Sequence, residues 1–112
     1  MSLIFGNLDS INIGKTMLNA AAPALLKGGQ AATDFAAHEF TQYAEDLDHI
    51  QQMVTANTLT EAQGQYYVDR RKLSMNSVLL TIEGLALIDV QNAVNAALNA
   101  LLGVVGGALN IK

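Results

Sequence analysis

Apolar residues recur at helical spacing over much of the chain, and the most regular pattern lies between about residues 30 and 56. Six apolar positions in this stretch are separated alternately by four and three residues, namely Ala36, Phe40, Tyr43, Leu47, Ile50 and Val54. This spacing places them along one side of a helix and is typical of helices that pack knobs into holes, as in a coiled coil. The pattern therefore predicts a long amphipathic helix over about 30–56.

A second, longer helix is predicted to run antiparallel to the first. Asn57-Thr58 interrupts the first helix, and Thr58-Leu59-Thr60-Glu61 matches the capping-box pattern of a new helix start. Because so short a connection brings consecutive helices side by side, the two segments form a hairpin. Gly64 and Gly84 each weaken the second helix by roughly 1 kcal/mol relative to alanine, but neither stops it. We predict a continuous helix over about 59–103, roughly 65 Å long.

An N-terminal helix is predicted over about 11–27, packed along the hairpin. Asp9, or the serine after it, can cap its start, because a short oxygen-bearing side chain accepts hydrogen bonds from the free amides of a first turn. Gly28-Gly29 ends the helix. Pro23 lies inside it and predicts a kink or break near Asn19, since proline cannot donate to the helical hydrogen-bond ladder.

The three predicted helices make an all-α protein with a single domain spanning 1–112. In this arrangement, opposite charges lie across from one another and help to set the register of the hairpin, although each surface pair adds only about 0 to 1 kcal/mol. The predicted register charges are Lys27 with Asp89, and Asp46 with Arg70 and Arg71.

The segment after residue 86 has the most unusual surface of the chain. It has no charged residue between Val90 and Ile111, whereas a surface helix normally has one apolar and one charged side. A narrow stripe of amides and glycines follows one side, made of Asn92, Asn95, Asn99, Gly103, Gly106 and Asn110. The rest of the helix has one side of bulky apolar residues and one side rich in alanine, and a single partner helix cannot cover both. We therefore predict that these two sides form a self-association interface. Its residues are Leu87, Val90, Ala93, Val94, Ala97, Leu98, Ala100, Leu101 and Val105.

Four interpretations of this segment are open. In the first, other copies of the chain cover it, so that the protein is a structural protomer of a homo-oligomer such as a helical filament, tube or shell. In the second, the helix enters or lies on a membrane, since about 20 apolar residues span one. The asparagines oppose this, because unpaired amides are costly in hydrocarbon. In the third, the long helix breaks near Gly84 and folds back into a compact monomer. In the fourth, the chain is an accessory subunit that binds a different protein through the same helix.

Composition favours a structural role over a nucleic-acid-binding one. The net charge of −4 argues against nucleic acid as a partner, because phosphate binding needs a basic surface. The chain has no cysteine, which excludes disulfides and zinc–thiolate sites. We expect a cytoplasmic protein, or one exported by a leaderless route, because the first residues lack the positive start and long apolar run of a signal peptide.

Only one group of residues resembles a chemical site, a polar stripe along the helix predicted at 30–56. Its members are His38, Gln42, Glu45 and His49. The two histidines are about 16 Å apart along the helix axis, too far to share one metal ion. The stripe also lies opposite the apolar seam, on the expected solvent side. Since the chain lacks a Gly-x-Ser-x-Gly motif as well, we predict no enzyme, no catalytic residue, no cofactor and no metal ion.

Overall fold

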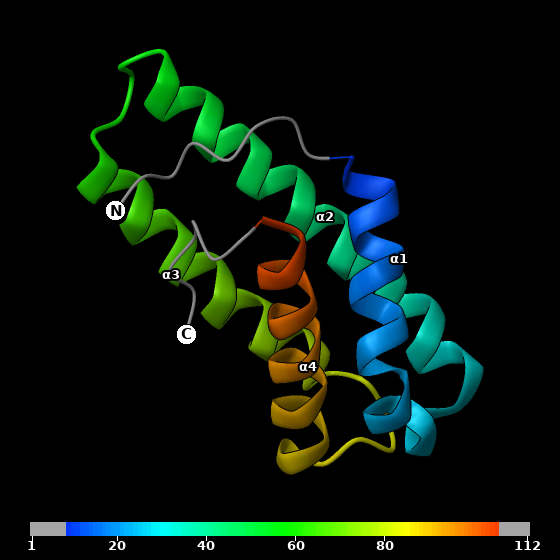
Figure 1. The fold of residues 1–112 in the computed structure, drawn as a ribbon. Coiled ribbons are helices and arrows are strands. Elements are labelled where there is room, and N and C mark those ends of the chain that lie inside the picture. Colours follow the sequence, from blue (N-terminus) through cyan, green and yellow to red (C-terminus); the bar gives the residue numbers. More distant parts are fainter. Residues whose placement is uncertain (1–8, 106–112) are drawn as a thin grey trace.

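The computed structural model describes residues 9–105, which form helices and turns with no strand. The elements in chain order are α1 (Ser10–Ala21), the 3₁₀ helix η1 (Ala22–Gly28), α2 (Gly29–Thr55), α3 (Glu61–Leu79) and α4 (Leu87–Val105). The predicted all-α class is therefore confirmed. Figure 1 shows α2 and α3 as the two arms of a hairpin, with α1 and α4 lying side by side next to it.

α1, η1 and α2 follow one another without an intervening loop. Asp9 caps α1 as predicted, because its carboxylate accepts a hydrogen bond from the Asn12 amide at 3.2 Å. The break that Pro23 predicts lies slightly later than Asn19: α1 ends at Ala21, and the proline stands at the start of η1, where its missing N–H costs no hydrogen bond. Gly29, with φ +69°, then turns the chain into α2.

The hairpin of α2 and α3 is confirmed, and its turn differs in detail from the prediction. The capping box begins at Thr60 instead of Thr58: the Thr60 hydroxyl accepts from the Gln63 amide at 3.1 Å, and the Gln63 side chain accepts from the Thr60 amide at 2.9 Å. Asn57 takes the left-handed conformation (φ 60°) that the turn needs. The two extra residues in the turn shift the cap but leave the antiparallel arrangement unchanged.

The second arm is shorter than predicted, because the continuous helix over 59–103 is interrupted. α3 ends at Leu79, residues 80–86 form a turn, and α4 folds back onto α1 and η1. The reversal occurs at Gly84, whose φ of +91° is in the left-handed region that favours glycine. Asp89 fixes the new helix start, since its carboxylate accepts from the Ala86 amide at 2.9 Å. The compact arrangement with a break near Gly84 is therefore the one that the chain adopts.

All five elements contribute to one apolar cluster. The six positions of the predicted heptad seam are buried, as expected for a helix that packs through this side. The largest fully buried side chains are Tyr43, Phe40, Met17, Leu25, Leu47, Met75, Leu79, Leu98, Leu101 and Val68. α1 packs on both α2 and α4, whereas α3 packs mainly on α2. The core is therefore centred on α1, α2 and α4, with α3 at its edge.

α1 and α2 approach each other most closely at Gly14. A Cβ atom at this position would lie within 3.0 Å of the backbone of Thr41 and would also overlap its hydroxyl. Backbone contacts at 3.0 Å are tighter than most in folded proteins, so the Thr41 hydroxyl would have to rotate and the two helices to shift slightly apart to admit a side chain. Gly14 therefore sets the distance between the helices that carry most of the core.

Gly14→Ala is expected to lower the free energy of unfolding by about 1 to 3 kcal/mol, because overpacking the contact with Thr41 outweighs the better helix propensity of alanine. Urea unfolding followed by circular dichroism measures this change. Gly103→Ala is the matched control: nothing lies within 4 Å of a Cβ there, so it should stabilise the protein by up to about 1 kcal/mol. Equal effects of the two substitutions would contradict the assignment of a close helix contact at Gly14.

Candidate functional site

Most of the predicted self-association residues of α4 are buried inside their own chain. Six of the nine are at most 2% exposed: Val90, Ala93, Val94, Ala97, Leu98 and Leu101. They face α1 and η1 because the turn at 80–86 folds α4 back, and so in this fold they are not a surface open to a second copy. Ala100 is half-buried and Leu87 is exposed, while the side chain of Val105 lies outside the part of the chain that the structure describes.

The opposite side of α4 faces solvent, and its own exposed side chains carry no charge, although Lys72 of α3 borders it at Asn95 and Asn99. Its exposed residues are Leu87, Ile88, Gln91, Asn92, Asn95, Asn99, Gly103 and Val104, and we call this set the outer surface of α4. It includes the predicted amide stripe up to Gly103. The stripe residues Gly106 and Asn110 lie outside the described residues. The sole acidic residue of the helix, Asp89, is only 13% exposed at its side chain and is used at the helix start.

The apolar character of α4 also meets the length and composition of a membrane-crossing helix. The window Leu87–Val104 has a mean hydropathy of 1.2, and only 33% of it is buried within the fold. Helices of soluble cores pass the same test, but they are mostly buried. α4 is therefore unusual in two respects. Its exposed side chains carry no charge, and most of its apolar window is not buried within the fold.

The structure brings together both predicted pairs of opposite charges. Lys27 Nζ lies 3.6 Å from Asp89 Oδ1, and Arg71 Nε lies 2.7 Å from Asp46 Oδ2. The first pair joins η1 to the start of α4, because α4 folds back onto η1. It does not join the two arms of one long hairpin, as predicted. Arg70 is directed elsewhere, with its guanidinium carbon 5.8 Å from the centre of the Tyr66 ring.

Arg71 is the centre of a partly buried ionic cluster between α2 and α3. Besides Asp46, it binds Glu39, whose Oε1 lies 2.6 Å from Arg71 Nη2. The two side chains are only 15% and 10% exposed. The guanidinium also lies over the Tyr43 ring, 5.5 Å from its centre. Glu39 was not predicted to take part in this cluster. The spacing could have indicated it, because Glu39 stands seven residues before Asp46, two helical turns away on the same side of α2.

Electrostatics keep this cluster in one charge state. Burial lowers the pKa of Arg71, but the hydrogen bonds that it donates to Asp46 and Glu39, together with their negative charges, raise it further than burial lowers it, so that the guanidinium remains charged. Burial also raises the pKa of the Tyr43 phenol well above its ordinary value, and the nearby Arg71 only partly opposes this. The Tyr43 hydroxyl is buried and has no hydrogen-bond partner among the described residues. A charged arginine held by two carboxylates beside a neutral phenol is suited to joining helices, and it offers no group poised to exchange protons.

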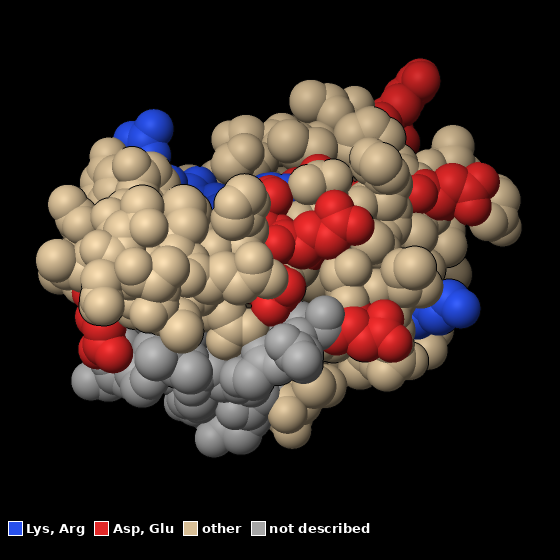
Figure 2. All heavy atoms as spheres, turned by 90° about the horizontal axis from the view of Figure 1, so that it is seen from above, with Lys and Arg blue, Asp and Glu red and all other residues tan. Residues whose placement is uncertain are grey.

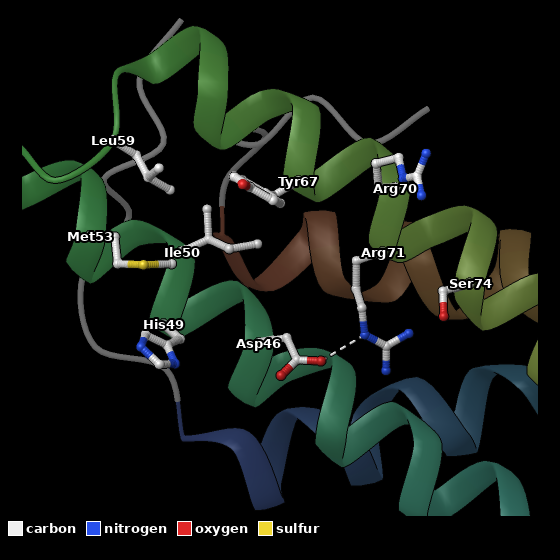
Figure 3. Close-up of a pocket in the computed structure, with 9 residues that line it drawn as sticks. All are labelled: Asp46, His49, Ile50, Met53, Leu59, Tyr67, Arg70, Arg71 and Ser74. Atoms are coloured by element: carbon white, nitrogen blue, oxygen red, sulfur yellow. Dashed lines mark hydrogen bonds and ion pairs between the residues drawn. The ribbon is translucent and has the colours of Figure 1, made fainter.

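A groove of about 500 Å³ lies beside this cluster, between the arms of the hairpin (Figure 3). It is lined by Asp46, His49, Ile50, Met53, Leu59, Tyr67, Arg70, Arg71 and Ser74. Figure 3 shows His49 and Ser74 at opposite ends of the groove, with Asp46 and Arg71 between them. This arrangement separates the one candidate nucleophile in the groove from the one imidazole that could activate it.

The polar stripe on α2 lies on the solvent side, as predicted. His38, Gln42, Glu45 and His49 are all exposed. Within residues 9–105, no three or more histidine, aspartate or glutamate side chains come together in a way that could hold a metal ion. Acidic side chains outnumber basic ones on the face seen in Figure 2, which is unlike the basic surface that nucleic-acid binding needs.

Comparisons with protein-family models, with curated protein sequences and with solved structures found no match to this chain.

Replacing Arg71 with methionine is expected to lower the free energy of unfolding by about 3 to 5 kcal/mol, because Glu39 would keep a buried charge without its partner. Arg70→Met is the control: it removes the same charge from an exposed position, where surface substitutions change stability by about 0.5 kcal/mol or less. Thermal and urea unfolding measure both. The double variant Glu39→Gln with Arg71→Met should recover part of the loss; a double variant no more stable than Arg71→Met alone would show that the uncompensated Glu39 charge is not the cause.

Proposed function

We propose that this is a structural protein that assembles with copies of itself, and that the outer surface of α4 makes the contact between copies. The observation that carries the proposal is the absence of charge among the exposed side chains of α4 itself. A helix at a permanent water boundary usually presents charged side chains, whereas depletion of charged residues is typical of the centre of a protein–protein interface. The proposed product is a homo-oligomer, and a head-to-tail arrangement of the contact would give a filament, tube or shell.

The side chains of the outer surface suit a helix–helix contact. Asn92, Asn95 and Asn99 each offer a donor and an acceptor, so that two copies of the stripe can satisfy one another across the contact. Gly103 allows close approach of a neighbouring backbone, because nothing lies within 4 Å of a Cβ there. The surface from Leu87 to Val104 is about 27 Å long, which is enough for several turns of a partner helix.

The apolar residues at the start of the helix add to the same contact. Leu87 and Ile88 are 57% and 58% exposed, and burial of an aliphatic side chain of this size contributes about 1.5 to 3 kcal/mol. They also lie next to the Lys27–Asp89 pair, which gives the end of the surface a charged edge. In the proposed contact, the apolar side chains at one end supply attraction between the copies, and the amides along the stripe supply specificity. The proposed role needs no cofactor and no catalytic residue.

Two lysines on the outer surface are expected to break the contact between outer surfaces while leaving the fold intact. In Asn95→Lys with Asn99→Lys, both side chains remain exposed in the free chain, but charges would repel a second copy at the contact. Sedimentation equilibrium should show concentration-dependent oligomers for the unaltered protein and smaller species for the variant. Ala62→Lys with Ser77→Lys is the control, because it adds the same charge at exposed positions of α3. An unaltered protein that stays monomeric at high micromolar concentration would refute the proposal.

A membrane-associated role is the second candidate, favoured by the length and low burial of the apolar window Leu87–Val104. It predicts that the unaltered protein floats with neutral phosphatidylcholine vesicles in a density gradient, and that the variant Asn95→Lys with Asn99→Lys does not, because lysine is costly in hydrocarbon. Neutral lipid avoids attraction of the added charges to an anionic surface. Recovery of the unaltered protein only at the bottom of the gradient would exclude this role and leave self-assembly as the function of α4.

A further inference from the structure

α4 is joined to the rest of the molecule by a single turn and rests on a surface that belongs to the first part of the chain. Its buried side packs on α1 and η1, whose own buried residues include Met17, Ala21 and Leu25. Its contact with α3, the helix directly before it, is slight. Lys27 and Asp89 close one end of this contact. We call the surface of α1 and η1 that receives α4 the acceptor groove.

The turn at 80–86 is close to being helical. After α3 ends, the Thr81 and Ile82 amides still donate to carbonyls three residues back, at 3.1 Å each, so that the chain continues in tight helical turns. The segment contains no proline, and its pattern alone predicts a helix that runs on without interruption. Among the described residues of the turn, only Gly84 is in the left-handed region. The direction of α4 therefore depends on the backbone of the few residues from Ile82 to Ala86, of which Gly84 is the one in the left-handed region.

A second conformation follows from this geometry. If Gly84 and the residues beside it, up to Ala86, take helical φ and ψ, then α3 and α4 join into one helix over about 61–105, and α4 is carried away from its own acceptor groove. The apolar side of α4 and the groove are then both exposed, which is unfavourable for an isolated chain. The two surfaces remain complementary to each other, and a second copy of the chain carries both.

We propose that copies of this protein assemble by exchanging α4, so that the helix of one copy fills the acceptor groove of another. This inference rests on the proposed self-assembly and adds to it a second contact between copies, made by the buried side of α4. The exchanged contact has the same residues as the contact within one chain, including the Lys27–Asp89 pair, so that the burial lost on opening is regained. Reciprocal exchange closes a dimer, while exchange from each copy to the next gives an open chain. The outer surface of α4 stays exposed in both and remains available for lateral contacts.

The acceptor groove selects a second copy over an unrelated partner. A foreign helix would have to match the alternation of small and large residues that α4 presents, such as Ala93 beside Val94 and Ala97 beside Leu98. It would also need a carboxylate at the position of Asp89 to meet Lys27. Only another α4 is certain to meet both conditions, because it meets them already within one chain.

Gly84→Ala tests the role of the turn. Alanine disfavours the left-handed conformation, and its Cβ would lie 2.9 Å from the Lys27 carbonyl oxygen, whereas helical φ and ψ relieve both problems. After refolding, the association constant measured by sedimentation should rise at least about tenfold. Ser77→Ala is the control, because it raises helix propensity at an exposed position of α3 without changing the turn or α4. A Gly84→Ala protein that is monomeric, whether folded or unfolded, overturns the proposal.

Cross-linking between copies decides whether the helix is exchanged. Because the chain has no cysteine, a Lys27→Cys copy and an isotopically heavy Asp89→Cys copy can be unfolded together, refolded and treated with a short bismaleimide. Exchange predicts a cross-linked dimer with one light and one heavy chain after this joint refolding, and none when the two folded proteins are only mixed. Oligomers that give no such dimer overturn the exchange but leave assembly through the outer surface of α4 standing. The absence of oligomers in the unaltered protein and in Gly84→Ala overturns both.

Discussion

The burial of α4 against α1 and η1 is the interaction on which the rest of the structure depends. Six of its apolar residues are essentially inaccessible to solvent there, and each fully buried aliphatic side chain contributes about 1.5 to 3 kcal/mol. A single left-handed glycine and a broken helix cost far less. The long straight hairpin is therefore abandoned in the single chain, because extending α3 would leave this side of α4 in water. The same burial leaves the uncharged outer surface as the part of α4 that faces outward.

α3 is held by a different kind of contact. It lies at the edge of the core, and its most specific link to α2 is Arg71, placed between Glu39 and Asp46. Such a cluster fixes orientation and register more than it adds stability, since bringing the charges out of water offsets much of their attraction. The molecule thus combines a closely packed group of α1, α2 and α4 with a peripheral α3 whose position is set by charge.

Helical periodicity was sufficient to predict α2, the hairpin and the burial of its seam, because local spacing decides which side of a helix is apolar. Charge complementarity was sufficient to pair Lys27 with Asp89 and Asp46 with Arg71. The break near Gly84 was an open alternative and not the predicted arrangement, because nothing local demands it: Gly84 costs only about 1 kcal/mol in a helix, and the decisive contact is with α1, far away in sequence. Glu39 was missed for a related reason, since its partner lies on another helix.

The order of the helices along the chain has a consequence for folding kinetics. α1, α2 and α3 meet through contacts that are near in sequence, while α4 must return to α1 and η1 across the whole hairpin. Contacts between distant segments form late, because the intervening loop must first be closed. Docking of α4 is therefore expected to be the last step of folding. If α4 is exchanged as proposed, the local density of chains at that step helps decide whose α4 arrives first, so that assembly becomes a matter of timing as well as affinity.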